Sequence, residues 1–362
     1  MARSRAFYRA QGKHSWIITL IVGLLVALIL LALWLFYDLQ RYIVYDKDTL
    51  RLVLPKDRTE PTELDASDEG PSVTFTPVNV EIVVDPTDYS DVEAVAGKEL
   101  RAIHARFLSS DSLTQTRLDG LSAGMGDFDS LVLELKPSLG LLRYESSLPL
   151  AVSYRVNGSL TLRETAEKLK QRDVWLIARL SALVDTTMAT RYAPIALKNS
   201  NGSGVFMQEG MAWLDPYNET VRDYLADLMA ELRDMGFDEI LFDGLWLPDS
   251  PLLVYSEEMT ATPDSLSAVS SLAMYLREQG DRLGLRVSVQ VQTTALLNQE
   301  SEKLGQDLAL FYKIFDRIAF ETNEDQLSAA LSALRSVAGE EDSRLLPISS
   351  SAIPGLTSWA IR

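Results

Sequence analysis

The stretch Trp213–Pro248, WLDPYNETVRDYLADLMAELRDMGFDEILFDGLWLP, predicts one helix followed directly by one strand. From Val221 to Met235, apolar side chains recur at intervals of 4, 3, 4 and 3 residues, which is the spacing of one buried helix face. Asn218 can cap this helix, because its side chain can accept a hydrogen bond from an unpaired backbone N–H. The apolar run Glu239–Asp243 (EILFD) then predicts a short buried strand.

The same alternation of helix and strand extends over residues 78–362. Alternating elements imply parallel strands joined by helical crossovers, and about 280 residues of this pattern suit a (β/α)8 barrel. We therefore predict an α/β fold, a TIM-like barrel that is incomplete or irregular at its closure, because the sequence ends soon after Ile348 without a clear final helix. The eight predicted strands are Val80–Val84, Arg101–Phe107, Ser130–Leu135, Val174–Arg179, Glu239–Asp243, Leu285–Val291, Arg317–Glu321 and Leu345–Ile348.

A doubly wound open sheet is the alternative fold. Its dinucleotide-binding forms carry a glycine-rich phosphate loop after the first strand, and the early predicted strands are not followed by one. The longest predicted loops, 136–158, 185–217 and 244–261, all follow the carboxyl ends of strands. A barrel would gather these loops on its catalytic face, which favours the barrel.

Two further helices have predicted starting points. Thr161 and Glu164 have the spacing of a capping box, in which two side chains each pair with a free backbone N–H at the helix start. Thr262 and Pro263 predict another start, because proline at the first helical position lacks an N–H that would be unpaired in any case.

The composition excludes several classes of chemistry. The chain has 362 residues, with 34 Lys and Arg against 51 Asp and Glu, and a formal net charge of -17. We expect no nucleic-acid partner, because neutralising phosphates requires clustered basic residues. The sequence has no cysteine and only two histidines, His14 and His104, which argues against thiolate metal sites and a Ser-His-Asp triad. We expect no metal and no cofactor.

The segment Trp16–Tyr37 carries no charge over 22 residues, long enough at about 1.5 Å per residue to cross a bilayer as a helix. Residues 1–15 contain four basic side chains and no acidic one, which predicts a cytoplasmic tail. The alternative is a cleaved signal peptide, but its apolar region would span only about 7–15 residues and end in small residues. Here the bulky run LWLFY occupies that place, so we predict a membrane anchor.

The predicted anchor sets the domain order. Residues 38–77 follow it, with a weakly alternating stretch at 42–55 that predicts a pair of short juxtamembrane strands. An acidic, Pro- and Ser-containing linker at 56–77 then leads to the barrel domain, residues 78–362. We therefore expect a single-pass cell-membrane protein with a cytoplasmic N-terminus and an extracytoplasmic barrel.

Three segments, Phe128–Ser146 (FDSLVLELKPSLGLLRYES), Leu169–Asp185 (LKQRDVWLIARLSALVD) and Trp213–Pro248, carry a family resemblance. The third is the most specific, because Trp-x-Asp-Pro-Tyr-Asn is followed by a helix and then by Gly-Phe-Asp-Glu-Ile-x-Phe-Asp. Together they resemble a family of bacterial membrane-anchored, glycosyl hydrolase-like TIM-barrel proteins. The resemblance implies a glycan substrate and a nucleophile or general base at Asp243.

The sequence also departs from this family at three places. The family continues Phe-Asp with Tyr-x-Arg-Phe-Pro, but residues 244–248 read GLWLP. An acid usually follows the lysine of the first matched strand, whereas Pro137 follows Lys136 here. A Pro- and Tyr-rich segment is replaced by RIAFETN at residues 317–323. Each change removes a polar group from the expected catalytic mouth.

Two acidic residues are the leading catalytic candidates. Side chains alternate along a strand, so Leu241 and Asp243 share a face, and this places Asp243 inside the barrel at its catalytic end. Glu321 ends the strand RIAFE and is predicted to be the proton donor of a carboxylate pair, which glycoside hydrolysis requires. The alternatives are a loop-capping Asp and a surface Glu at the start of a helix.

Glu134 is a third candidate acid, and it shares a strand face with Lys136. Arg179 ends the next predicted strand, so these three residues can form an ion network in the barrel mouth and contact substrate. Lys136 and Arg179 can also lower the pKa of Asp243. Because buried charges need partners, a purely structural network is an equally good interpretation.

Trp213, Asp215 and Trp246 lie in or beside the expected mouth loops, where aromatic rings could stack on sugars and bind substrate. The alternative is that these side chains pack the loops onto the barrel. For Trp213 and Asp215 the packing interpretation is favoured, because Asp215 begins a turn that leads to the cap residue Asn218.

The predicted function is that of a membrane-anchored, extracytoplasmic glycoside-hydrolase-like protein that acts on a polysaccharide, such as a cell-wall glycan, with a carboxylate pair. The departures motivate an alternative, a catalytically degenerate barrel that binds envelope glycan or protein. A third possibility is an envelope assembly protein without a glycan ligand. The separation of Asp243 from a second carboxylate discriminates among them.

Overall fold

The computed structural model describes residues 43–46, 49–52, 100–255, 264–338, 342–353 and 355–362. The chain divides into two compact units, Met1–Ile82 and Val83–Arg362. In the first unit, β1 (Ile43–Asp46) pairs antiparallel with β2 (Thr49–Leu52), which confirms the strand pair predicted within residues 42–55. The predicted anchor, the linker and the predicted strand Val80–Val84 lie outside the described residues. Among the helices that are described, none is both long and apolar enough to span a membrane.

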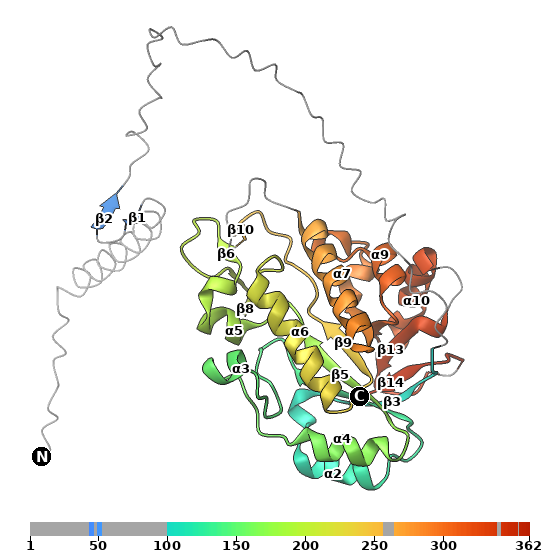
Figure 1. Cartoon of the computed structure of the whole chain (residues 1–362). Coiled ribbons are helices and arrows are strands. Elements are labelled where there is room, and N and C mark those ends of the chain that lie inside the picture. The colour runs from blue at the N-terminus through green and yellow to red at the C-terminus, as the bar shows by residue number, and fades with distance from the viewer. Residues whose placement is uncertain (1–42, 47–48, 53–99, 256–263, 339–341, 354) are drawn as a thin grey trace, which may run out of the picture. The chain divides into compact units, whose positions relative to one another are not determined.

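In the second unit, eight parallel strands close into a barrel that helices surround (Figure 1). Each strand pairs with its neighbour in chain order, and the last strand, β14, pairs with the first, β3, to complete the ring. The predicted TIM-like barrel is therefore confirmed. The barrel strands are β3 (His104–Leu108), β4 (Ser130–Lys136), β5 (Trp175–Ser181), β9 (Glu239–Asp243), β11 (Arg286–Val291), β12 (Ile318–Glu321), β13 (Leu345–Ser349) and β14 (Trp359–Ile361).

Seven of these strands match predicted ones, and the eighth, β14, is a strand that the sequence did not predict. Strand β14 escapes prediction from the sequence because it has only three residues. In addition, the described part of its connection from β13 contains no helix, so the alternating pattern is absent. The closure is complete, and its irregularity lies in this helix-free connection.

The helices start close to where the sequence places them, with two corrections. Asn218 caps α6 as predicted, since its side chain accepts a hydrogen bond from the N–H of Thr220. Thr161 precedes α4 but forms no capping box, because its hydroxyl pairs with Gln115 instead. The cap of α7 is Asp264. The helices are α2 (Gln115–Ala123), α3 (Pro149–Ser153), α4 (Leu162–Lys170), α5 (Thr186–Arg191), α6 (Glu219–Asp234), α7 (Ser265–Leu283), α8 (Thr293–Leu297), α9 (Leu308–Ile314) and α10 (Glu324–Ala338).

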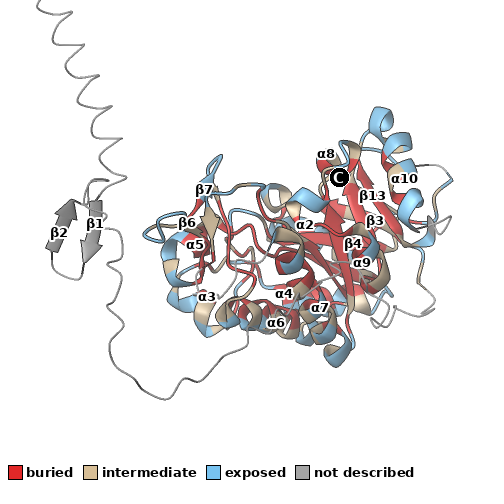
Figure 2. Cartoon of the chain, turned by 90° about the horizontal axis from the view of Figure 1, so that it is seen from above, coloured by how far each residue is buried: buried red, intermediate tan, exposed pale blue. Residues whose placement is uncertain are grey.

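The barrel strands are mostly buried on both faces, and the helices expose their outer sides (Figure 2). One apolar cluster fills the barrel interior and a larger one lies between the strands and the helices. In β9, Leu241 belongs to the interior cluster, whereas Ile240 and Phe242 belong to the outer one. This alternation directs Asp243 into the barrel, as predicted.

The long loops after β5 and β9 carry small sheets of their own. One antiparallel pair joins the two loops, and a second is a hairpin within the loop after β5. The four strands are β6 (Lys198–Asn199), β7 (Met207–Gln208), β8 (Met211–Ala212) and β10 (Leu253–Val254).

Candidate active site

Arg179 is the centre of the polar cluster at the carboxyl ends of the barrel strands. Its Nη2 donates to Asp243 Oδ2 at 2.7 Å, and its Nη1 donates to Glu134 Oε1. Its Nε donates to Gln290 Oε1 at 3.0 Å. These residues come from β4, β5, β9 and β11, so one guanidinium group connects four strands of the barrel. Arginine suits this role, because its five donors lie in one rigid plane.

Glu321 joins the same cluster from β12. Its Oε1 lies 3.5 Å from Arg179 Nη2, the nitrogen that also contacts Asp243. Because Arg179 Nη2 is 2.7 Å from Asp243 Oδ2 and 3.5 Å from Glu321 Oε1, these two oxygens are at most about 6.2 Å apart. That separation is below the upper limit of about 9.5 Å for the carboxylate pairs of glycosidases. The structure therefore places Asp243 close to a second carboxylate, the proximity predicted from the sequence.

Burial dominates the electrostatics of Asp243, whose side chain is only 14% exposed. Desolvation raises the pKa of its carboxyl group above the ordinary aspartate value, because burial disfavours the charged form. The Arg179 charge and the N–H of Gly244 oppose this shift, whereas the nearby charges of Glu321 and Glu134 add to it. The net direction is upward, so Asp243 holds its proton more strongly than a free aspartate does.

A cavity of about 480 Å³, here called the mouth cavity, opens beside these residues. Its size lies in the range of about 300–1,000 Å³ that is typical of small-molecule sites. Apart from Arg179, Asp243 and Glu321, its side chains are mainly amides and hydroxyls, which can hydrogen-bond to a polar ligand. The lining residues are Arg179, Asp243, Gln290, Val291, Gln292, Thr293, Thr294, Glu321, Thr322, Asn323 and Gln326.

Lys136 does not lie in the mouth, which corrects the prediction that it contacts substrate. Its side chain has no exposed surface, and its Nζ contacts Asp185 Oδ2 at 2.7 Å and the Ser181 carbonyl at 2.6 Å. The ladder between β4 and β5 shifts register between Glu134 and Lys136. This irregularity moves Lys136 away from the strand face that it was predicted to share with Glu134. This ion pair connects the end of β4 to the segment after β5, so its role is structural.

The aromatic candidates pack the loops. Trp213 and Asp215 are fully buried, so neither can contact a ligand in this structure. Asp215 accepts a hydrogen bond from the N–H of Tyr217, the turn geometry that the packing interpretation requires. Trp246 is partly buried and packs edge-on against Trp213, with ring centroids 5.3 Å apart. It does not line the mouth cavity, and its predicted role in substrate binding stays a prediction.

Three residues of the cluster escape prediction from the sequence. Gln290 lies on the polar face of the alternating strand LRVSVQV, and this alternation was the available signal for it. Arg362 donates to both oxygens of Glu321, and Phe107 lies beneath two guanidinium groups. The available signal for Arg362 was its alternation with Ala360, but this required recognising β14.

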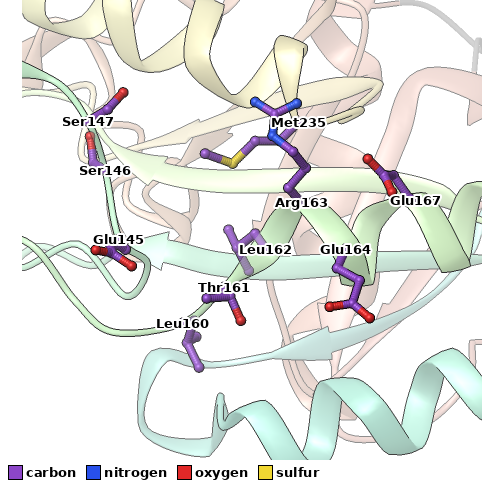
Figure 3. Close-up of a pocket in the computed structure, with 10 residues that line it drawn as sticks. All are labelled: Glu145, Ser146, Ser147, Leu160, Thr161, Leu162, Arg163, Glu164, Glu167 and Met235. Carbon is purple, nitrogen blue, oxygen red and sulfur yellow. The ribbon is translucent and has the colours of Figure 1, made fainter.

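Among the residues that the structure describes, no group of three or more His, Asp or Glu side chains is arranged to hold a metal ion. A separate cavity of about 550 Å³ lies between a loop, the start of α4 and the end of α6, and Figure 3 shows its lining. It includes Arg163 and Glu164 but none of the residues of the polar cluster around Arg179. We therefore assign the candidate active site to the mouth cavity.

A closed parallel barrel with acidic residues at the carboxyl ends of its strands is the usual arrangement of a TIM-barrel active site. The chain belongs to the family described as "Putative glycosyl hydrolase domain", whose model matches residues 105–320. This match confirms the resemblance found in the sequence.

A solved structure agrees at the level of the fold. The glycoside hydrolase domain of PgaB (BpsB) from Bordetella bronchiseptica is 15% identical and has a TM-score of 0.54, over 72% of this chain and 93% of that one. A hypothetical protein from Ruminiclostridium thermocellum is 23% identical, with a TM-score of 0.45, over 51% of this chain and 96% of that one. The glycoside hydrolase domain of PelA from Pseudomonas aeruginosa is 16% identical, with a TM-score of 0.37 and coverages of 68% and 83%. No curated protein matches the sequence.

Proposed function

We propose that this protein is a membrane-anchored, extracytoplasmic glycoside hydrolase that cleaves a polysaccharide with a carboxylate pair. One observation carries the proposal: Asp243 and Glu321 contact the same nitrogen of Arg179 beside the mouth cavity. Family membership supports the reaction class.

The environments of the two acids favour different roles. The pKa of Asp243 is raised by burial, which is the direction that a general acid requires in order to hold the proton it gives to the leaving oxygen. Both oxygens of Glu321 accept hydrogen bonds from Arg362, which suits an ionised nucleophile or base. This assignment exchanges the roles expected from the family resemblance. Glu134, which accepts from Arg179 and from the N–H of Ser110, is the second candidate for the ionised partner.

The lining of the mouth cavity supports a glycan as substrate. Its amide and hydroxyl side chains match the many hydroxyl groups of a sugar, each of which needs a hydrogen-bond partner when water is displaced. A second cavity of about 260 Å³ shares Thr322 and Asn323 with the mouth cavity. Two adjoining cavities favour a chain of sugars over a single one.

The decisive experiment compares wild type, Asp243→Asn and Asp249→Asn on a panel of polysaccharides, with reducing ends as the readout. Asp249 is an exposed acid in the loop after β9 and serves as the matched control. We expect wild type and Asp249→Asn to cleave one substrate equally. Asp243→Asn should lose about 10²–10⁴-fold in rate, the usual contribution of a general acid. Equal cleavage by Asp243→Asn would exclude the assigned role.

The location is proposed from the sequence alone, because residues 16–37 are uncharged and follow a basic tail. A reporter enzyme that is active only outside the cytoplasm, fused after Arg362, tests it. We expect activity in the membrane fraction of cells, and loss of that activity when residues 16–37 are deleted. Activity in the soluble fraction of the wild-type fusion would contradict the anchor.

A glycan-binding module is the second candidate function, and one contact favours it. Arg362 donates hydrogen bonds to both oxygens of Glu321. In this conformation a substrate would have to displace Arg362 to contact either oxygen. This candidate predicts that wild type and Asp243→Asn retain the same polysaccharide on an affinity gel, and that neither releases reducing ends.

A further inference from the structure

Phe107 supports both arginines of the mouth. The guanidinium carbon of Arg179 lies 5.5 Å from the centre of its ring, and that of Arg362 lies 5.1 Å from it. Both distances are within the range of a cation–π attraction, about 6 Å. Phe107 is 2% exposed and belongs to the cluster inside the barrel, so the ring cannot move away from its position.

The closing strand of the barrel brings Arg362 to this place. Its backbone N–H donates to the Ser349 carbonyl at 2.9 Å, which continues the ladder between β13 and β14. Ala360, two residues earlier, belongs to the interior cluster. Side chains alternate along a strand, so Arg362 lies on the same face as Ala360 and reaches Glu321 of β12 with a side chain that is 46% exposed.

Arg362 donates hydrogen bonds to Glu321 from both of its terminal nitrogens. Nη2 donates to Oε1 at 2.6 Å and Nη1 donates to Oε2 at 3.1 Å. Two parallel hydrogen bonds fix the plane of a carboxylate as well as its position. The other contacts to Glu321 from side chains are longer, 3.4 Å from Gln290 and 3.5 Å from Arg179. The contacts from Arg362 are therefore the shortest that side chains make to the Glu321 carboxylate.

We propose that Arg362 is a positioning residue, which holds Glu321 in the orientation that faces Arg179 and Asp243. Through it, the closure of the barrel by β14 is coupled to the geometry of the carboxylate pair. This inference rests on the proposed hydrolase function for its effect on turnover, but the effect on Asp243 does not depend on any substrate.

The electrostatic consequence can be measured on the free protein. The charge of Glu321 raises the pKa of Asp243, and the positive charge of Arg362 partly neutralises Glu321. Removing that positive charge should leave Asp243 with a stronger negative neighbour. Replacing it by lysine keeps the charge but cannot reproduce the two parallel hydrogen bonds.

The test uses Arg362→Gln, Arg362→Lys and the control Arg282→Gln, which removes an exposed arginine of α7 that pairs with Glu278. The titration of Asp243 is followed by carboxyl ¹³C NMR of the full chain, and thermal unfolding verifies that each variant is folded. In Arg362→Gln, the titration of Asp243 should move to higher pH. In Arg362→Lys and Arg282→Gln, it should stay where it is in wild type.

Turnover supplies the second readout. Arg362→Lys should lower kcat by up to about 100-fold, the effect of a small misplacement of a catalytic group, with a much smaller change in KM. An unchanged Asp243 titration in Arg362→Gln, or an equal shift in Arg282→Gln, would overturn the inference. If wild type cleaves no glycan, the proposed function fails, and the titration still decides whether the charge of Arg362 is coupled to the carboxylate pair, whereas the orientation of Glu321 is tested by the kcat of Arg362→Lys.

Discussion

At the scale of single residues, Asp243 shows how burial and pairing compete. Arg179 and the N–H of Gly244 both favour its charged form, yet desolvation outweighs them and the pKa rises. Lys136 and Asp185 form a fully buried pair in which each charge neutralises the other. An unpaired buried charge would be costly, so that pair has a structural role, while Asp243 remains available for proton transfer.

The raised pKa of Asp243 makes the stability of the protein depend on pH. The folded protein holds this proton more tightly than the unfolded chain, whose aspartates titrate near about 3.9. The associated stability is present below that value and is lost as the pH rises through the raised pKa. The asparagine of the Asp243→Asn variant does not titrate, so this variant does not lose stability in this way. The difference in free energy of unfolding, variant minus wild type, should therefore increase from about pH 3 to about pH 7.

Urea unfolding of both proteins at the two pH values measures this difference. The exposed Asp249→Asn variant is the control, because its site is solvated. A difference between Asp243→Asn and wild type that stays constant with pH would contradict the burial argument.

At the scale of elements, the turn after β9 positions Asp243. Gly244 has a φ of +60°, a left-handed conformation that side chains disfavour. A Cβ atom there would collide with the Ser181 hydroxyl of β5. The Gly244 N–H also donates to the Asp243 carboxylate. The glycine therefore allows β5 and β9 to approach closely while the backbone supports the acid.

Gly244→Ala should reduce both stability and turnover, because the new methyl group would push the turn away from β5. The control is Gly202→Ala, which has a similar φ of +69° but no atom within 4 Å of the place that its Cβ would occupy. We expect Gly202→Ala to cost about 1 kcal/mol from backbone strain alone and Gly244→Ala to cost more. Equal costs in urea unfolding would show that the contact with Ser181 is unimportant.

At the scale of the whole molecule, three residues of β14 complete the ring of eight strands. Ala360 is fully buried in the barrel interior, within a closely packed set of side chains. Ala360→Leu should overfill this space and destabilise the protein by about 1–3 kcal/mol. The exposed Ala329→Leu on α10 should change stability by less than about 0.5 kcal/mol. Equal stability of the two variants in chemical denaturation would argue against a closed, packed barrel.

Much of the fold was predictable, because most barrel strands are apolar runs flanked by amphipathic helices, a signal that is local in the sequence. Strand β14 was not predictable in this way, since three residues carry too little pattern. The site was predictable in part. Asp243, Glu134, Glu321 and Arg179 follow from alternation along their strands, whereas Arg362 depends on β14.

The sequence by itself determined the barrel architecture and the inward direction of its terminal polar side chains, because periodicity is a property of neighbouring residues. Only the tertiary structure decided the pairings, since they join residues far apart in the chain. Arg179 contacts three carboxylates, Arg362 holds Glu321, and Lys136 is buried against Asp185. These contacts depend on the register and closure of the barrel, which no local pattern encodes.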